Sequence, residues 1–174
     1  MKPFSDNIIF WDTEMSTLDP YEGEIISMGL VKPSGEELYM ELEHDGTVHP
    51  WVERNVMPYL TGEKISRPEA IKKFTEFLGP SRPYLVAYAN FFDAVYLYKL
   101  LGVKDDTKDF PFHWLHMDFA SMLFAMGIDP QRYSTSNPAS LMKEFGLDPN
   151  AYRHHHALDD ARRLKDMYLK MLEK

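Results

Sequence analysis

Three short segments with the composition of β-strands fill most of the first 44 residues. They cover residues 7–15, 24–31 and 37–44 and are rich in β-branched, aromatic and other apolar side chains. Pro33 and Gly35 stand between the second and third segments, where a hairpin has to reverse direction. The spacing therefore predicts a domain that opens with three strands in meander order.

The rest of the chain alternates helical and strand-like patterns. Helices are expected over residues 68–79, 90–102, 137–147 and 157–174, and strands over 84–89 and 113–120. A meander followed by alternating strands and helices predicts an α/β fold with a mixed sheet. The length of 174 residues suits one domain that covers residues 1–174.

Composition narrows the classes of function. A formal net charge of -8 argues against a basic face that coats nucleic acid or an anionic membrane, but it permits a nucleic-acid substrate held through divalent cations. The absence of cysteine excludes disulfides, thiolate zinc sites and cysteine nucleophiles, and fits a reducing compartment. No segment approaches the roughly 20 apolar residues of a spanning helix, nor does the start resemble a signal peptide. We expect a cytoplasmic protein without a membrane partner.

Two carboxylates, Asp12 and Glu14, lie within the first predicted strand. Side chains two residues apart on a strand project from the same face, so both point the same way out of an otherwise apolar segment. A solvated strand face explains such a pair as well as a functional site does.

Asp93 follows the strand expected over 84–89, where the chain should enter a helix. The helix dipole favours an acid in the first turn, which is a purely structural explanation. The carboxyl ends of strands are also where open α/β sheets build their sites. Both interpretations of Asp93 are compatible.

The stretch HHHALDDARR, residues 154–163, combines histidines, acids and arginines. Asp160 falls in the apolar stripe of the last helix, so it should face the core and require a cation or a donor. Asp159 is interpreted as an ordinary first-turn acid. Arg162 and Arg163 are expected to be solvated or paired with acids rather than catalytic.

The three histidines are not equivalent. His155 lies five residues before Asp160 and cannot share its helix face, so it would act from the preceding loop, a suitable place for a mobile base. His154 and His156 are interpreted as exposed polar residues. A triple-histidine zinc site is the rival hypothesis, but adjacent histidines rarely converge on one tetrahedral ion and no HExxH motif accompanies them.

These acids and the histidine occur in an order that resembles the DEDD superfamily of 3′-to-5′ exonucleases, specifically its DEDDh branch. That branch includes oligoribonuclease, RNase T and the proofreading subunits of replicative polymerases. The matching segments are FWDTEMST, YANFFDAVYL and HHALDDAR. The third fits the pattern H-x-A-x-x-D-A with His155, Ala157, Asp160 and Ala161.

Within this branch, the compact length, the WDTE opening and the Tyr/Ala-rich second motif are most similar to the small bacterial exoribonucleases that trim single-stranded 3′ ends of RNA. The second motif departs from many members, which have a His-Asn pair before the aspartate. This chain has Tyr88, Ala89 and Asn90 there. The departure concerns substrate contacts more than the metal site.

The resemblance implies an RNase H-like fold, with a five-stranded mixed sheet flanked by helices. It also implies that Asp12, Glu14, Asp93 and Asp160 bind two Mg²⁺ or Mn²⁺ ions and that His155 is the general base. Carboxylates suit these hard cations. The implied reaction is hydrolysis of single-stranded 3′ ends, of RNA before DNA, with release of nucleoside 5′-monophosphates.

Substrate contacts are expected next to the acids. Met15 and Phe92 should wedge or stack the terminal nucleotides, since stacking on apolar and aromatic surfaces needs no sequence readout. Trp11 is a weaker candidate, because strand alternation turns it away from Asp12.

Three other functions are compatible with the sequence. They are a proofreading-type exonuclease of single-stranded DNA, a nucleic-acid-binding module with this fold and little activity, and a metal-dependent phosphatase or nucleotidase. Contacts to the 2′-hydroxyl would decide between RNA and DNA. The apolar segment 118–127 fits either the core or a homodimer interface, and the base rate for buried Met and Phe favours the core.

Overall fold

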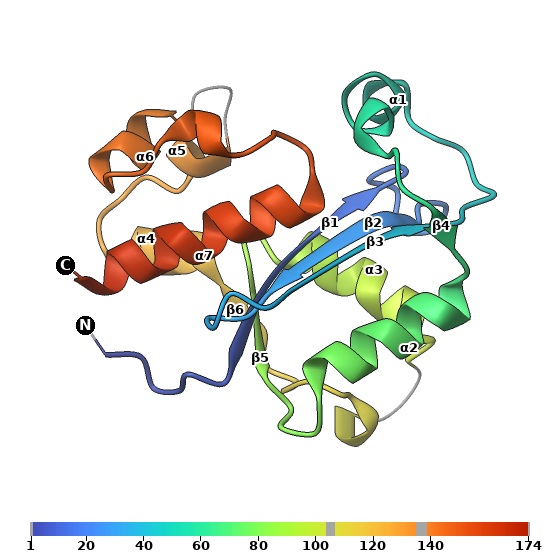
Figure 1. The fold of residues 1–174 in the computed structure, drawn as a ribbon, viewed down its shortest axis with the longest axis horizontal. Coiled ribbons are helices and arrows are strands. Elements are labelled where there is room, and N and C mark those ends of the chain that lie inside the picture. Colours follow the sequence, from blue (N-terminus) through green and yellow to red (C-terminus); the bar gives the residue numbers. More distant parts are fainter. Residues whose placement is uncertain (1, 104–106, 135–138, 174) are drawn as a thin grey trace.

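The computed structural model describes residues 2–103, 107–134 and 139–173, in which six strands form one sheet (Figure 1). The strand order is β4-β3-β2-β1-β5-β6. The strands are β1 (Ile8–Met15), β2 (Ile25–Val31), β3 (Glu37–Leu42), β4 (Lys64–Ile65), β5 (Tyr84–Ala87) and β6 (Met117–Asp118). β1, β2 and β3 form the antiparallel meander, whereas β4, β5 and β6 pair in parallel with their neighbours. The predicted α/β class with a mixed sheet is confirmed, with six strands in the described residues instead of five.

Helices connect the strands and close the chain. They are α1 (Pro50–Asn55), α2 (Arg67–Leu78), α3 (Phe91–Leu101), α4 (Phe119–Ala125), α5 (Gln131–Ser134), α6 (Ala139–Glu144) and α7 (Ala157–Glu173), with short 3-10 turns at Met57–Tyr59, Thr107–Asp109 and Pro149–Ala151. α3 ends where Gly102 adopts a left-handed conformation, which glycine tolerates best. Among the described residues, no helix is both long and apolar enough to cross a membrane.

The strand expected over 113–120 is wrong in most of its length. Only Met117 and Asp118 pair with β5, and Phe119 already begins α4. The carboxylate of Asp118 accepts a hydrogen bond from the backbone N–H of Ser121 at 3.0 Å and caps the helix. The helix expected over 137–147 is observed as α6, while residues 137 and 138 lie outside the described residues.

The sheet separates two main apolar cores. Helices cover both of its faces (Figure 1). Alternation along β1 sends Ile9 and Trp11 toward α2 and α3, and Ile8 and Phe10 toward α4, α6 and α7. Trp11 is fully buried, and it turns away from Asp12 as the alternation predicts. In segment 118–127, Phe119 and Leu123 lie in the core, whereas Phe124 is exposed.

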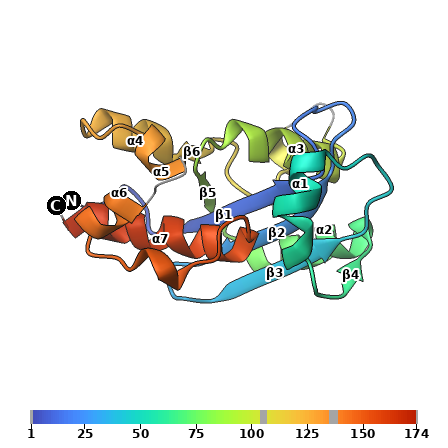
Figure 2. The same ribbon diagram turned by 90° about the horizontal axis from the view of Figure 1, so that it is seen from above.

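The short helix α1 covers the end of the sheet beyond the start of α7. Figure 2 shows α1 and the β1–β2 loop together at this end. Val52 of α1 and Val56, the residue that caps its carboxyl end, pack on Ile26 of β2 in a small third core. This packing holds α1 beside the carboxyl end of β1.

The first turn of α7 lies directly on β2 at Gly29. A Cβ atom at this position would overlap the backbone of Ala157 and Leu158, so only glycine permits the contact. Gly29 pairs with Asp12 of β1 on one side and Tyr39 of β3 on the other. The start of α7 therefore passes between two side chains of the same sheet face.

Substitution Gly29→Ala tests this contact. The added methyl group should push α7 away from β2 and cost about 1–3 kcal/mol or more, because the obstructing atoms are backbone. For a chain of this size, each kcal/mol corresponds to a fall of about 2–4 °C in the melting temperature. The control is Gly46→Ala, where the nearest atom would lie at 3.6 Å. Equal melting temperatures for Gly29→Ala and wild type would contradict the packing.

Candidate active site

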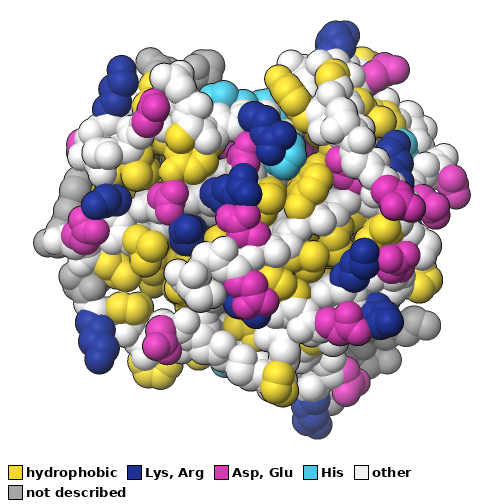
Figure 3. All heavy atoms as spheres, in the orientation of Figure 1, with side chains coloured by type: hydrophobic (Ala, Val, Ile, Leu, Met, Phe, Trp, Pro, Cys, Tyr) yellow, Lys and Arg dark blue, Asp and Glu magenta, His cyan; other side chains and the backbone are white. Residues whose placement is uncertain are grey.

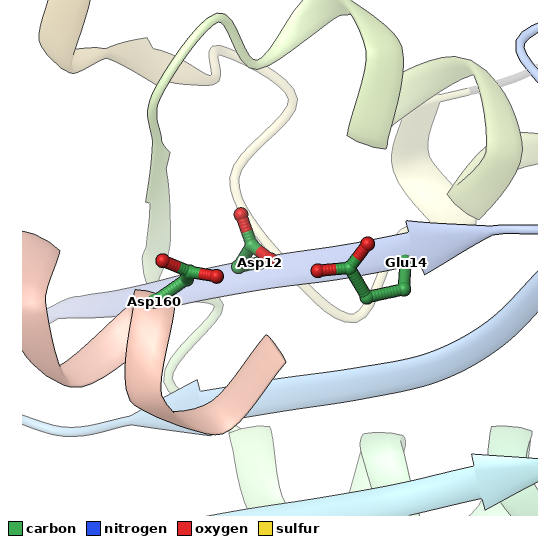
Figure 4. Close-up of side chains that lie close together, drawn as sticks. All are labelled: Asp12, Glu14 and Asp160. Atoms are coloured by element: carbon green, nitrogen blue, oxygen red, sulfur yellow. The ribbon is translucent and has the colours of Figure 1, made fainter. Parts of the chain in front are cut away.

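Three carboxylates from two elements meet above the sheet. Asp12 and Glu14 come from β1, and Asp160 comes from the first turn of α7. Each offers an oxygen atom, and these oxygens lie within 4.8 Å of one another. Figure 4 shows the three side chains directed toward a shared space. The predicted common face of Asp12 and Glu14, and the inward direction of Asp160, are both observed.

Burial and mutual repulsion make this acidic group costly while it is charged. Burial raises the pKa of Asp12 well above its usual range and that of Glu14 to about 8, and the charges of Asp160 and Asp93 add to both effects. Arg163 opposes them. A cluster of like charges removed from water needs a cation, and carboxylate oxygens are the ligands that hard divalent ions prefer. The donor set therefore fits Mg²⁺ or Mn²⁺.

Asp93 lies in the first turn of α3 and holds the strand that carries the other acids. Its Oδ1 accepts hydrogen bonds from the backbone N–H of Thr13 at 2.9 Å and from the Thr13 hydroxyl at 2.7 Å. β5 pairs with β1 only as far as Phe10, so within the described part of the chain the N–H of Thr13 has no strand partner on that side of β1. The carboxylate of Asp93 accepts this N–H instead. Burial raises the pKa of Asp93 to about 7, although these hydrogen bonds lower it. Asp93 is outside the group within 4.8 Å but close enough to influence its charges.

His155 stands in the turn before α7, as the spacing predicts. Its backbone φ is 56°, a left-handed conformation that costs a non-glycine residue on the order of 1–3 kcal/mol. The imidazole is exposed and lies edge-on to the indole of Trp51, with 4.8 Å between ring centroids. Partial desolvation lowers the pKa of His155, and the charge of Asp160 opposes this effect. The ring is therefore neutral at pH 7 and can accept a proton.

His156 is buried, so the prediction of an exposed residue is wrong. Its ring stacks on Tyr39 of β3 with 4.6 Å between centroids. Its carbonyl accepts the N–H groups of Asp159 and Asp160 at 2.8 and 3.0 Å, which begins the helix. The physical reason is the contact of α7 with the sheet, which a local sequence pattern does not contain. His156 anchors the turn in which His155 projects.

Asp159 is also more than an ordinary first-turn acid. It is buried, and its carboxylate accepts from Nε of Arg153 at 2.5 Å and from Nη1 of Arg162 at 2.7 Å. Arg162 in turn pairs with Glu37 of β3. These ion pairs connect the loop before α7 to the sheet. The pair of Asp159 and Arg162 could have been predicted from the sequence, because the two residues have the three-residue spacing of a helical ion pair.

A small cavity of about 260 Å³ opens beside Glu14. Met15 at the end of β1 and Leu18 in the β1–β2 connection line it on one side, and Trp51 and Val52 line it from α1. Figure 3 shows histidine side chains reaching the surface where α1 and the start of α7 meet. Met15, the expected substrate contact, therefore lines a cavity beside Glu14, together with Leu18 and Trp51, which no pattern in the sequence singled out.

Phe92 lies elsewhere, at the exposed start of α3. It is not among the residues that line this cavity, and its ring packs against Phe91 with 4.1 Å between centroids. Asp93 is the next residue, so the aromatic pair stands at the same end of α3 as this acid. The two expected substrate contacts thus come from different elements, Met15 from β1 and Phe92 from α3.

The sequence matches no protein-family model and no curated protein. Solved structures do share its fold. The nuclease domain of 3′hExo, a DEDDh family member bound to rAMP, aligns with a TM-score of 0.67 and 14% identity over 95% of this chain and 91% of that domain. A chain in the structure of the yeast NOT1 MIF4G domain co-crystallised with CAF1 aligns with a TM-score of 0.59 and 14% identity over 97% and 81% of the two chains.

The catalytic unit of Neurospora crassa Pan2, which contains a protease and a nuclease domain, aligns with a TM-score of 0.58 and 14% identity. The alignment covers 99% of this chain and 28% of the Pan2 chain. This chain therefore shares the RNase H-like fold of the 3′hExo nuclease domain.

The raised pKa of Glu14 has a consequence for stability without metal. The folded protein keeps this proton up to about pH 8, whereas a glutamate in an unfolded chain loses it near pH 4.3, so stability falls as the pH rises through that window. In the presence of a chelator, Glu14→Gln should melt above wild type at pH 8, by about 2–4 °C for each kcal/mol gained, and close to wild type at pH 5.

Thermal unfolding at both pH values provides the measurement. Glu22→Gln is the matched control, since Glu22 is exposed and outside the acidic group. A Glu14→Gln variant that melts at or below the wild-type temperature at pH 8 would show that the cluster is not strained by its charges.

Proposed function

We propose that the protein is a metal-dependent 3′-to-5′ exonuclease that shortens single-stranded 3′ ends, of RNA in preference to DNA, and releases nucleoside 5′-monophosphates. The observation that carries this proposal is the meeting of Asp12, Glu14 and Asp160 within 4.8 Å on the fold of a DEDDh nuclease domain. Asp93 is close enough for its charge to raise the pKa of Asp12, so it belongs to the same acidic site. The ions proposed are two Mg²⁺ or Mn²⁺.

The acids have distinct tasks in this proposal. Asp12, Glu14 and Asp160 would hold the ions from a strand and a helix that are packed together, since α7 is seated on the sheet at Gly29. Asp93 is the fourth proposed ligand and also fixes the backbone between Asp12 and Glu14 through Thr13. Bound divalent ions would neutralise charge on the scissile phosphate and favour ionisation of the attacking water.

His155 is the proposed general base. Its lowered pKa keeps the imidazole neutral at pH 7, so Nδ1 or Nε2 can take a proton from the attacking water. The anchored neighbours His156 and Asp159 hold the turn, and the indole of Trp51 packs against the His155 ring. The base is thus placed by its surroundings rather than by a regular helix.

The cavity beside Glu14 suits the terminal base of a nucleic acid. Met15 and Trp51 supply an apolar and an aromatic surface, and stacking of this kind accepts any base. The exposed pair of Phe91 and Phe92 offers a second surface for the preceding nucleotide. The 3′hExo domain was solved with rAMP, which makes RNA the first substrate to test.

Exposed Phe124 on α4 leaves an apolar contact for a second copy in a homodimer.

A product assay with Asp12→Asn tests the function. The protein is incubated with Mg²⁺ or Mn²⁺ and 5′-labelled single-stranded RNA, single-stranded DNA, a duplex with a 3′ overhang, or a mononucleotide. We expect a ladder of shortened RNA from the wild type and none from Asp12→Asn, because the variant loses a charged ligand of the ions. Circular dichroism checks that the variant is folded.

Each other result has a defined meaning. Activity in Asp12→Asn removes this residue from the ion site, and faster loss of DNA reverses the substrate preference. Phosphate release from the mononucleotide alone would indicate a nucleotidase. Binding of RNA without shortening would indicate a nucleic-acid-binding module.

His155→Ala should lower kcat by about 100-fold or more, the usual contribution of a general base. Binding of Mn²⁺ should remain unchanged, since this side chain is not a proposed ligand. The control is His154→Ala, which removes the adjacent exposed imidazole and should change kcat only slightly. Steady-state kinetics on single-stranded RNA and calorimetric Mn²⁺ titration measure the two effects. Equal losses in both variants would argue against a specific role for His155.

A further inference from the structure

Arg163 is a buried cation that the proposed chemistry does not use. Only 9% of the residue is exposed. It lies one turn after Asp160 on α7, and its Nη2 is 2.6 Å from Oδ1 of Asp160. Burying a guanidinium is costly unless a charge or strong acceptor compensates it. The acid that compensates Arg163 is a proposed ligand of the ions.

The guanidinium is also held from its other side. It lies over the ring of Tyr133, 4.7 Å from the centroid, in a cation–π contact. Tyr133 is itself buried and stacks on Tyr88 with 4.4 Å between centroids. Nε of Arg163 is buried and has no hydrogen-bond partner among the described residues. The ion pair and the aromatic ring therefore determine where this side chain lies.

The positive charge of Arg163 acts on the whole acidic group. It lowers the pKa of Asp12 and of Glu14 in addition to that of Asp160. No other basic side chain is paired with the three clustered acids among the residues the structure describes. Arg162, the preceding residue, instead pairs with Asp159 and Glu37.

We infer that Arg163 is the resident counter-cation of the acidic site: it stabilises the three carboxylates when divalent ions are absent, and it competes with those ions for Asp160. This inference rests on the proposed metal site. A carboxylate oxygen bound by a guanidinium has less negative charge to offer a cation. Arg163 thus acts as a positioning residue that weakens ion binding and keeps the empty site assembled.

Three variants separate this role from simple packing. Arg163→Met keeps an unbranched apolar stem and removes the charge, whereas Arg163→Lys keeps a charge. Arg162→Met is the matched control, because it removes an arginine from the adjacent position of the same helix without touching the clustered acids. The measurements are melting temperatures in chelator and in saturating Mn²⁺, and the Kd for Mn²⁺ by calorimetry.

We expect Arg163→Met to melt several degrees below wild type in chelator and to bind Mn²⁺ about tenfold more tightly, the effect of removing one nearby charge. Saturating Mn²⁺ should recover most of the lost melting temperature. Arg163→Lys should resemble wild type in Kd, and Arg162→Met should leave Kd unchanged. If Arg163→Met does not fold, Arg163→Gln gives the same comparison of Kd.

An unchanged or weaker Kd in Arg163→Met, with equal losses of melting temperature in both conditions, would overturn the inference and assign Arg163 to packing. The same tightening in Arg162→Met would overturn it as well, because the effect would then be one of net charge. Wild-type protein that binds no Mn²⁺ would overturn the metal site and this inference together. If the wild type binds Mn²⁺ and shortens RNA but Arg163→Met has the wild-type Kd for Mn²⁺, the inference about Arg163 fails while the proposed function stands.

Discussion

The seating of α7 on Gly29 is the contact on which the candidate site depends. Gly29 lies between Asp12 and Tyr39 in adjacent strands, and the helix start passes over it with backbone against backbone. His156 therefore reaches Tyr39 on one side, while Asp160 reaches Asp12 on the other. Because Gly29 of β2 has no side chain, α7 lies close enough to the sheet to position both Asp160 and the turn that carries His155.

The acidic group is assembled against its own electrostatics. Burial and repulsion raise the pKa of Asp12 and Glu14, so their ionised forms destabilise the folded protein. Local compensation is provided by Arg163 on Asp160 and by the Thr13 hydrogen bonds on Asp93. Such an unfavourable cluster is typical of a functional site, where proteins accept a local loss of stability.

Much of the site could be predicted from local periodicity. The two-residue spacing of Asp12 and Glu14 gave their shared face, and the helical stripe gave the inward direction of Asp160. The α/β class followed from the order of the patterns. These features depend on the geometry of one strand or one helix, which a short stretch of sequence contains.

The predictions that failed concern contacts, both distant and local, that a hydrophobic pattern does not contain. His156 was expected at the surface because nothing near it in sequence announces Tyr39 as a partner. Asp118 ends a strand by capping α4, which an apolar run cannot reveal. Trp51 stands on a six-residue helix, too short for a periodic pattern to show which face it presents.

The hydrogen bonds between Asp93 and Thr13 join two segments that are 80 residues apart in the chain. Through them the first turn of α3 is fastened to the strand that carries Asp12 and Glu14. Phe92, the expected stacking surface, belongs to the same turn. Phe92, Asp93 and Thr13 thus form one connected unit, so a displacement of the first turn of α3 would also shift the segment of β1 between Asp12 and Glu14.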